Sequence, residues 1–266
     1  SQNIVPVIIG GTSALMPALD RALSSGKQKW SMVSVDSRID FTAEKRPADS
    51  LNWMNDLIYR NGSCLSHLSA IGHQTYLTDQ QMVNRFNRRH YDMLRIGEVR
   101  SAVHETEPLF RDAAAAIFDI GSVRQSDAPG TFLPSANGFY GEEICLLSRY
   151  AGLSDNLKVF SVMEVNPTLD SRMQTSHLAA QLVWFFLEGF SQAHGRTLVA
   201  DLAERVGQQR VVGAMYTLCA DLGMRVISEG VETVEERDAL IALGADLLQG
   251  YLFARPSEEV SEPILV

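Results

Sequence analysis

The chain has 266 residues, 45% of them hydrophobic and 21% charged, which is enough apolar material for one large core or for one core with a small appendage. Its formal net charge of -9 and the lack of a long run of Lys and Arg argue against nucleic acid as a partner. The longest apolar stretch, residues 178–190, is interrupted by Gln181 and Glu188 and is shorter than the roughly 20 residues that cross a membrane. We therefore expect a globular protein with no membrane partner.

The N-terminus and the cysteines bear on localisation. The first ten residues show neither the basic segment nor the cleavage signature of an export signal, and they read as a strand already in progress. Cys64, Cys145 and Cys219 are far apart and do not stand at metal-ligand spacing with histidines. Buried thiols in a reducing compartment are the simplest interpretation, so we expect a cytoplasmic protein.

Short apolar segments alternate with helical patterns along the chain. The predicted strands are residues 5–9, 32–36, 94–99, 115–120, 159–165, 225–228 and 248–253. Such continuous apolar runs are typical of strands buried on both faces. The alternation predicts an α/β protein, a three-layer α/β/α arrangement with a mainly parallel sheet.

The helical segments carry their own start and stop signals. One apolar stripe runs through residues 51–58, a second follows a capping pattern at Thr78, and a third ends at Gly152, a predicted C-terminal cap. A capping box at residues 233–236 opens the last predicted helix. The polar, small-residue stretch 191–195 is the one compositional seam, and we place a boundary there, between residues 1–192 and 193–266.

Five motifs occur in a fixed order in the first part. They are Gly10-Gly11-Thr12-Ser13, Asp36-Ser37-Arg38-Ile39-Asp40, Phe118-Asp119-Ile120-Gly121 with Asp127-Ala128-Pro129-Gly130-Thr131, Gly138-Phe139-Tyr140-Gly141-Glu142-Glu143, and Glu164-Val165-Asn166-Pro167. Over about residues 4–190 the chain thus resembles the ureohydrolase family of arginases, agmatinases and formimidoylglutamases, without that family's N-terminal strands. The strings at 124–129 and 138–143 resemble the formimidoylglutamase-like branch.

The resemblance implies a hydrolase in which two Mn²⁺ ions, held by six protein ligands, activate a water. Carried over by position, Asp36, Asp40 and Asp119 remain as metal ligands, with Asp36 and Asp119 also in the catalytic role. The other three ligand positions hold Ser13, Arg38 and Gly121. We expect an impaired binuclear site, with no metal or one weakly bound Mn²⁺ or Mg²⁺. We also hypothesise that Arg38 replaces a metal cation by forming charge-assisted hydrogen bonds to Asp36, Asp40 or Asp119.

The same resemblance implies a substrate site. Glu164 corresponds to the catalytic carboxylate that binds the substrate's guanidinium, and Glu142 and Glu143 lie near a wall of the pocket. His73, like His67, falls in a loop-like segment close to the position of a proton shuttle. Local pairing of Glu164 and ordinary hydrogen bonding of the loop histidines are the alternatives.

The last part resembles a different family. Residues 225–233 (Arg-Val-Ile-Ser-Glu-Gly-Val-Glu-Thr) and 244–256, which include Gln249-Gly250-Tyr251-Leu252-Phe253, resemble the end of an EAL-type cyclic-di-GMP phosphodiesterase. The resemblance implies two βα units of a TIM-type barrel, with Glu229 and Gln249 as remnants of its site. The barrel's earlier motifs are missing, so we do not expect phosphodiesterase activity. The two units could pack on the same sheet as the first part.

These observations favour a degenerate ureohydrolase that is a pseudoenzyme or a binding scaffold. The first alternative is a metal-dependent hydrolase of linear amidine or guanidine C–N bonds, with a small guanidino or amidino compound as substrate. The second is an EAL-type module that binds cyclic-di-GMP. A homo-oligomer is left open.

Overall fold

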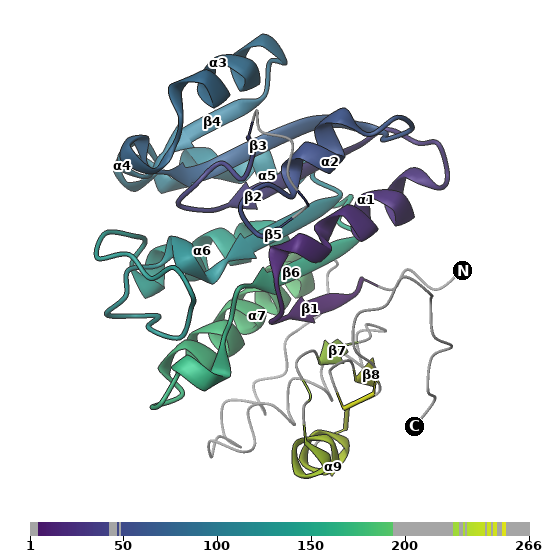
Figure 1. Ribbon diagram of the computed structural model, residues 1–266, viewed down its shortest axis with the longest axis vertical. Helices are drawn as coiled ribbons and strands as arrows, with labels where there is room; N and C mark the ends of the chain where they lie inside the picture. The colour runs from purple at the N-terminus through teal and green to yellow at the C-terminus, as the bar shows by residue number, and fades with distance from the viewer. Residues whose placement is uncertain are drawn as a thin grey trace.

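The centre of the computed structural model is an eight-stranded sheet of order β4-β3-β2-β5-β6-β1-β7-β8, in which every neighbouring pair of strands is parallel (Figure 1). The structure describes residues 5–42, 47, 49–193, 226–228, 231, 233–242, 244–245, 247–248 and 252–253. The strands are β1 (Val7–Ile9), β2 (Trp30–Val35), β3 (Leu65–His73), β4 (Asp92–Arg95), β5 (Ala115–Asp119), β6 (Val159–Met163), β7 (Val226–Ser228) and β8 (Leu247–Leu248).

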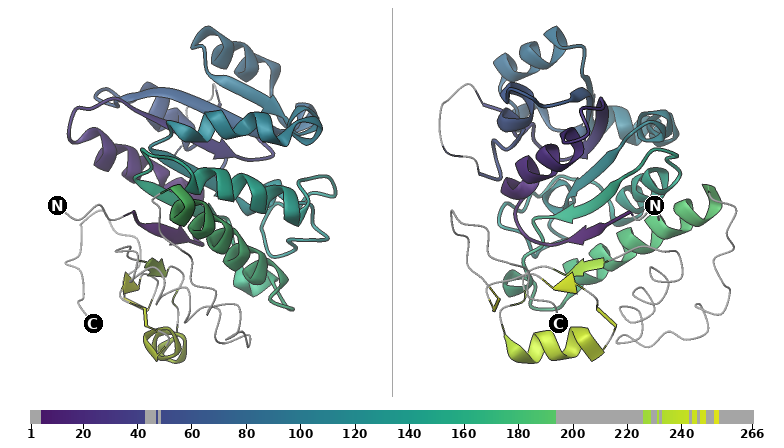
Figure 2. Two further views of the ribbon diagram at one scale, coloured as in Figure 1. Left: turned by 180° about the vertical axis from the view of Figure 1, so that it is seen from behind. Right: turned by 90° about the vertical axis from the view of Figure 1, so that its right-hand side faces the viewer.

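Helices cover both faces of this sheet (Figures 1 and 2). They are α1 (Met16–Ser24), α2 (Met54–Tyr59), α3 (Gln80–Arg88), α4 (Ile96–Ser101), α5 (Glu107–Arg111), α6 (Gly141–Gly152), α7 (Gln174–Ala193) and α9 (Val234–Ala242). The side chains of Met32 and Ile117 pack with α1, α2 and α3 in one buried cluster, whereas Val33 and Phe118 pack with α4 to α7 in another. Because successive strand residues point to opposite faces, each strand feeds both clusters. The predicted three-layer α/β/α architecture is confirmed.

Glycines allow α6 and α7 to lie in direct contact. A Cβ atom on Gly152 would lie 2.1 Å from the Phe186 carbonyl oxygen, and one on Gly189 would lie 2.1 Å from the Arg149 carbonyl oxygen. Gly152 is the last residue of α6 and not a cap beyond it. The sequence correctly marked the end of the helix there, but the close helix contact is what requires a glycine.

Two segments differ from the predictions. Residues 65–73, which were interpreted as a loop, form the long strand β3, so His67 and His73 are strand residues. The predicted strand 94–99 is wrong from residue 96 onward, because β4 ends at Arg95 and α4 begins at Ile96. The Glu98 carboxylate accepts a hydrogen bond of 2.8 Å from the Arg95 backbone N–H, which starts the helix.

The described part of the C-terminal segment continues the sheet. In the register, Val7 is opposite Val226 and Ile227 is opposite Leu247, so β7 and β8 extend the sheet beyond β1. A TIM-barrel arrangement of this segment is not confirmed. Glu229, Gln249 and Cys219 lie outside the described residues. Among the helices that the structure describes, none combines the length and apolarity needed to span a bilayer.

Candidate metal centre

Three aspartates meet at the carboxyl ends of the neighbouring strands β2 and β5. Asp36 directly follows β2, Asp119 is the last residue of β5, and Asp40 lies four residues beyond Asp36. β2 and β5 are paired, with Val35 opposite Phe118, and this brings the strand ends together. Each aspartate offers a carboxylate oxygen, and these three oxygens lie within 4.8 Å of one another. The sequence predicted these three residues as metal ligands, and the structure brings them together.

Each carboxylate is oriented by a donor of its own. The Arg38 backbone N–H donates to Asp36 Oδ1 (2.9 Å), and the Gly121 backbone N–H donates to Asp119 Oδ1 (2.6 Å). Asp40 Oδ2 accepts from the indole Nε1 of Trp53 (2.8 Å), which comes from the turn before α2. Trp53 was not predicted as a site residue, because an indole in an apolar helical stripe carries no signal of a second role. The donors fix the cluster before any ligand arrives.

The cluster is buried, and this shifts its proton equilibria. Burial raises the pKa of Asp36, and it raises the pKa values of Asp40 and Asp119 well above their ordinary value, with the charge of Asp36 adding to both. Buried carboxylates that repel one another retain protons unless a cation neutralises them. The cluster could therefore hold either a shared proton or a metal cation.

Glu164 lines the same cavity, directly after β6. Its backbone is in the left-handed region, with φ of 62°, and its N–H donates to the Gly11 carbonyl oxygen (2.8 Å). Its Oε1 accepts a hydrogen bond of 2.7 Å from the Ser13 backbone N–H. The alternative, that Glu164 only pairs locally, therefore holds for its Oε1, which is bonded to Ser13. The residue nevertheless also lines the cavity.

The prediction that the Arg38 side chain hydrogen bonds to the aspartates is wrong. Arg38 lines the cavity and is half-buried, but within the described residues its guanidinium makes no hydrogen bond or ion pair with Asp36, Asp40 or Asp119. Its charge acts at longer range and is a minor cause that lowers the pKa values of Asp36 and Asp119. A half-buried guanidinium can keep its charged end in water, which avoids the cost of full burial.

The cavity itself is small, with a volume of ≈ 20 Å³. A cavity needs a volume of roughly 10–15 Å³ to hold one water molecule, so this cavity has room for one small ion or one water. Gly121 borders the cavity, and a Cβ atom there would lie 2.9 Å from Asp119 Oδ1. Ser13 is buried beside Glu164 and is not among the residues that line the cavity.

The remaining predicted residues lie elsewhere. Glu143 pairs with Arg100 (2.8 Å) and accepts from the Tyr140 N–H (2.9 Å), and Glu142 is exposed on the first turn of α6. His67 pairs with Asp92 (2.8 Å) at the edge of the sheet. His73 lines a separate cleft. The structure does not bring these four residues to the aspartates.

Comparison with known families agrees with this geometry. The model of the arginase family matches residues 1–188, and the model of the EAL domain matches residues 195–256. The chain belongs to the arginase family. The second match bears out the EAL resemblance of the C-terminal region of this arginase-family chain.

Relatives of the arginase-family chain share its fold at low identity. It is 25% identical over 199 residues to the formimidoylglutamase of Bacillus subtilis, covering 70% of this chain and 61% of the relative. The crystal structure of a Bacillus subtilis formimidoylglutamase superposes with a TM-score of 0.63 at 21% identity, over 70% of this chain and 61% of that one. The crystal structure of a Trypanosoma cruzi formiminoglutamase with Mn²⁺ superposes with a TM-score of 0.64 at 20% identity, over 73% of this chain and 66% of that one. The chain thus spans about 61% of the length of its Bacillus relative.

A relative of the EAL type is also found. The cyclic di-GMP phosphodiesterase RocR of Pseudomonas aeruginosa is 33% identical over 127 residues, which is 47% of this chain and 32% of that protein.

Proposed function

We propose that this chain is a degenerate ureohydrolase, a pseudoenzyme or binding scaffold whose cleft holds a single divalent cation on Asp36, Asp40 and Asp119. The observation that carries the proposal is the convergence of three buried carboxylates in a cavity that also contains Gly121 and Arg38. Carboxylate oxygens suit Mg²⁺ and Mn²⁺. One such ion would offset most of the negative charge of the three aspartates, and it would be held by carboxylates that are already oriented by hydrogen bonds.

A pair of manganese ions does not fit these residues. Gly121 has no side chain that could act as a metal ligand, and Arg38 places a positive charge at the same cavity. The positive charge of Arg38, which acts on Asp36 and Asp119 at longer range, would also disfavour a second cation in this cavity. Hydrolysis by a pair of metal ions is therefore not part of the proposed function.

The first test is hydrolysis. We expect purified protein with added Mn²⁺ to release no ammonia, formamide or urea from formimidoylglutamate or arginine beyond the level of Asp36→Ala. The exposed Asp155→Ala serves as a matched control, since it removes a carboxylate far from the cavity. Turnover that Asp36→Ala and Asp119→Ala abolish, and Asp155→Ala retains, would contradict the proposal.

That contrary result would establish the second candidate, a hydrolase of linear amidine or guanidine C–N bonds that acts on a small guanidino or amidino compound. Its support is the position of Glu164 in the wall of the aspartate cavity, where a carboxylate could pair with a cationic substrate. In this candidate Asp36, Asp40 and Asp119 hold one metal, and Glu164 positions the substrate.

The match to the EAL domain supports a third candidate, cyclic-di-GMP binding without hydrolysis. Glu229 and Gln249 would contact the nucleotide. Titration with cyclic-di-GMP tests it, because Gln249→Ala should weaken any binding. A cytoplasmic location and a homo-oligomer remain predictions.

A further inference from the structure

Trp53 holds the side chain of Asp40 from outside the aspartate cavity. Its indole Nε1 donates a hydrogen bond of 2.8 Å to Asp40 Oδ2, and the two residues are 1% and 2% exposed. Trp53 is not among the residues that line the cavity, so it would not touch a cation there. A buried indole N–H needs an acceptor, and a backbone carbonyl oxygen would serve. Here the acceptor is a carboxylate of the proposed cation site, so the hydrogen bond also affects how that carboxylate can bind a cation.

The segment that carries Asp40 is also fixed by the start of α2. The Met54 backbone N–H donates to the Asp40 carbonyl oxygen (3.1 Å). Asn55 binds the backbone of Thr42 with two hydrogen bonds, since its Nδ2 donates to the carbonyl oxygen (2.9 Å) and its Oδ1 accepts from the N–H (2.9 Å). Asp40 is therefore restrained through its backbone and its side chain, and its carboxylate cannot turn without breaking the hydrogen bond from Trp53.

Protein donors occupy one oxygen of each aspartate. The donors are the Trp53 indole to Asp40 Oδ2, the Arg38 N–H (2.9 Å) and the Ser37 hydroxyl (3.4 Å) to Asp36 Oδ1, and the Gly121 N–H (2.6 Å) to Asp119 Oδ1. Hydrogen bonds to ligating carboxylates orient these groups and tune their affinity for a metal. An oxygen that already accepts an N–H bond is a poorer ligand, because a cation has to compete with the donor. The geometry thus favours contact through one oxygen of each aspartate.

The number of oxygens that each carboxylate offers matters because divalent cations differ in the ligands that they accept. Ca²⁺ takes about six to eight oxygen ligands in a flexible arrangement and often binds both oxygens of a carboxylate. Mg²⁺ takes about six ligands and usually keeps several waters, and Mn²⁺ also suits an octahedral set of oxygens. Three single carboxylate oxygens therefore suit the smaller cations better than Ca²⁺.

We propose that Trp53 determines the cation specificity of this site: by holding Asp40 Oδ2 it limits Asp40 to one oxygen toward the cation, and so favours Mn²⁺ and Mg²⁺ over Ca²⁺. The inference rests on the proposed single-cation site and adds the determinant of its selectivity. Trp53 acts through Asp40 and is a positioning residue. The donors to Asp119 and the shorter donor to Asp36 are backbone N–H groups, so Trp53 is the donor that a side-chain exchange can remove.

Calorimetric titration of the whole chain with Mn²⁺ and, separately, with Ca²⁺ tests the proposal. We expect the parent chain to bind Mn²⁺ at least about tenfold more tightly than Ca²⁺. Trp53→Phe removes the N–H and keeps an aromatic ring in the core. It should lower the ratio of Mn²⁺ to Ca²⁺ affinity at least about fivefold, because Asp40 Oδ2 becomes free for the larger ion.

Circular dichroism establishes whether Trp53→Phe is folded. If it is not, replacement of Trp53 by β-(3-benzothienyl)alanine makes the same test, since this analogue keeps the shape of the indole and carries sulfur in place of the N–H. The same fall in the affinity ratio is expected.

Trp30→Phe is the matched control. Trp30 is 4% exposed, packs in the same buried cluster as Trp53, and donates from Nε1 to the Ser24 hydroxyl oxygen (3.2 Å) instead of a carboxylate. This variant should keep the affinity ratio of the parent chain, although it too loses a buried indole N–H.

The proposal is overturned if the parent chain binds Ca²⁺ as tightly as Mn²⁺, if removal of the Trp53 N–H weakens both ions equally, or if Trp30→Phe changes the ratio as much. A parent chain that binds neither ion would refute the proposed cation site itself, and the specificity of Trp53 with it. Binding of Mn²⁺ with an unchanged ratio in Trp53→Phe would refute only the role of Trp53.

Discussion

Gly72 shows how one residue fixes the local geometry between the aspartate cavity and the cleft lined by His73. Its φ of 96° lies in the left-handed region, and a Cβ atom there would lie 2.3 Å from Cε2 of Phe139. Both the backbone conformation and the contact demand glycine.

We therefore expect Gly72→Ala to lower the free energy of unfolding by about 2–4 kcal/mol, through backbone strain and a displaced Phe139 ring. Gly97→Ala is the control. Gly97 lies in α4, and a Cβ atom added there has no other atom within 4 Å. The Gly97→Ala substitution should therefore leave the free energy of unfolding unchanged or raise it by up to about 1 kcal/mol. Urea denaturation of both variants measures the two changes in the free energy of unfolding. Equal changes in Gly72→Ala and Gly97→Ala would contradict this account of Gly72.

At the residue scale the sequence predicted the aspartate cluster well and the side-chain contacts poorly. The resemblance to the ureohydrolase family pointed to Asp36, Asp40 and Asp119; Asp36 and Asp119 lie at the ends of predicted strands, and parallel strands bring their ends to one edge of the sheet. The direction of the Arg38 guanidinium depends on the space left by neighbours distant in sequence, which a motif does not contain. Trp53 was missed as a donor to Asp40 for the same reason.

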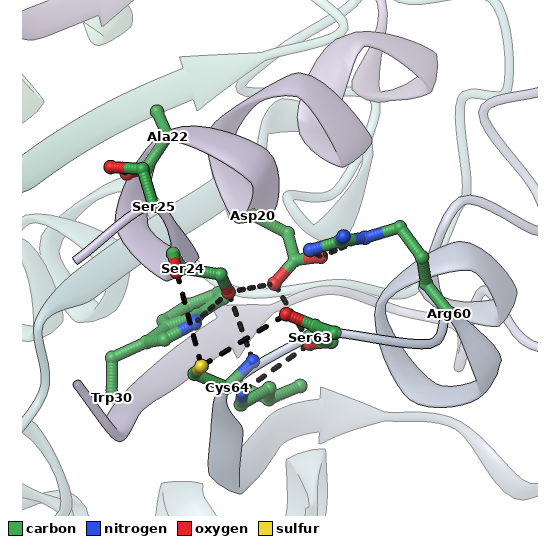
Figure 3. Close-up of polar contacts among 10 residues, drawn as sticks. Asp20, Ala22, Ser24, Ser25, Trp30, Arg60, Ser63 and Cys64 are labelled. Carbon is green, nitrogen blue, oxygen red and sulfur yellow. Dashed lines mark hydrogen bonds and ion pairs between the residues drawn. The ribbon is translucent and has the colours of Figure 1, made fainter. Parts of the chain in front are cut away.

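Among the elements, α1 is tied to the turn between α2 and β3 by a polar network (Figure 3). Asp20 on α1 is 1% exposed and accepts from Arg60 Nε (2.8 Å) and from the Ser63 hydroxyl (2.8 Å). Ser24 donates to Asp20 and accepts from the Trp30 indole and the Cys64 N–H. This network anchors the amino ends of β2 and β3, opposite the cation site.

Arg60→Gln should lower the free energy of unfolding by about 3 kcal/mol, because it leaves the Asp20 carboxylate buried without its charged partner. The exposed pair of Arg111 and Glu107 provides the comparison, and Arg111→Gln should cost less than about 1 kcal/mol. Chemical denaturation of both variants measures the difference. Similar losses would mean that the network does not depend on the buried charge pair.

The start of α7 gives a prediction on pH. Asp170 is 4% exposed; burial alone would raise its pKa, but hydrogen bonds from the backbone N–H groups of Ser176 and Thr175 and from their hydroxyls hold the pKa below its usual value. A lowered folded-state pKa adds stability above the unfolded-state pKa of about 3.9, and this stability disappears as the pH falls through the folded-state value.

Asp170→Asn should thus cost about 1 kcal/mol at pH 7, and the difference from the parent chain should shrink below about pH 4. Thermal unfolding across this range tests it, with the exposed Asp155→Asn as control. A difference that stays constant down to the lowest pH would show that the charge of Asp170 does not contribute.

Element boundaries were predictable where the sequence was uniformly apolar. β5 and β6 were found within one or two residues, since residues 115–119 and 159–163 have few polar side chains. β3 was missed because Ser66, His67 and Ser69 interrupt its apolar pattern. Their side chains are accommodated by the Trp30 carbonyl and by Asp92 on the neighbouring strand, partners that become visible only in the folded sheet.

At the scale of the whole molecule, the two family-like parts meet in one sheet. β1 lies between β6 of the arginase-family part and β7 of the EAL-like part, and both pairings are parallel. Leu240 and Ala245 pack against the same buried cluster as α6 and α7. The change of family near residue 192 was predictable from the sequence, but the shared sheet was one of several packings that the sequence allowed.

Because β1 is flanked by both parts, we expect one cooperative unfolding transition for the whole chain. Fluorescence of Trp30, Trp53 and Trp184, which all lie in the first part, and far-ultraviolet circular dichroism should give the same midpoint. Two separated transitions would contradict a common core.

The central claim is that the cleft holds one cation and not a pair. Metal analysis of protein equilibrated with Mn²⁺ and then separated from free ion measures it directly, with Asp119→Asn and Asp155→Asn treated in parallel. We predict one Mn²⁺ per chain, lost in Asp119→Asn and retained in Asp155→Asn. Two Mn²⁺ ions per chain, both dependent on Asp119, would contradict the account.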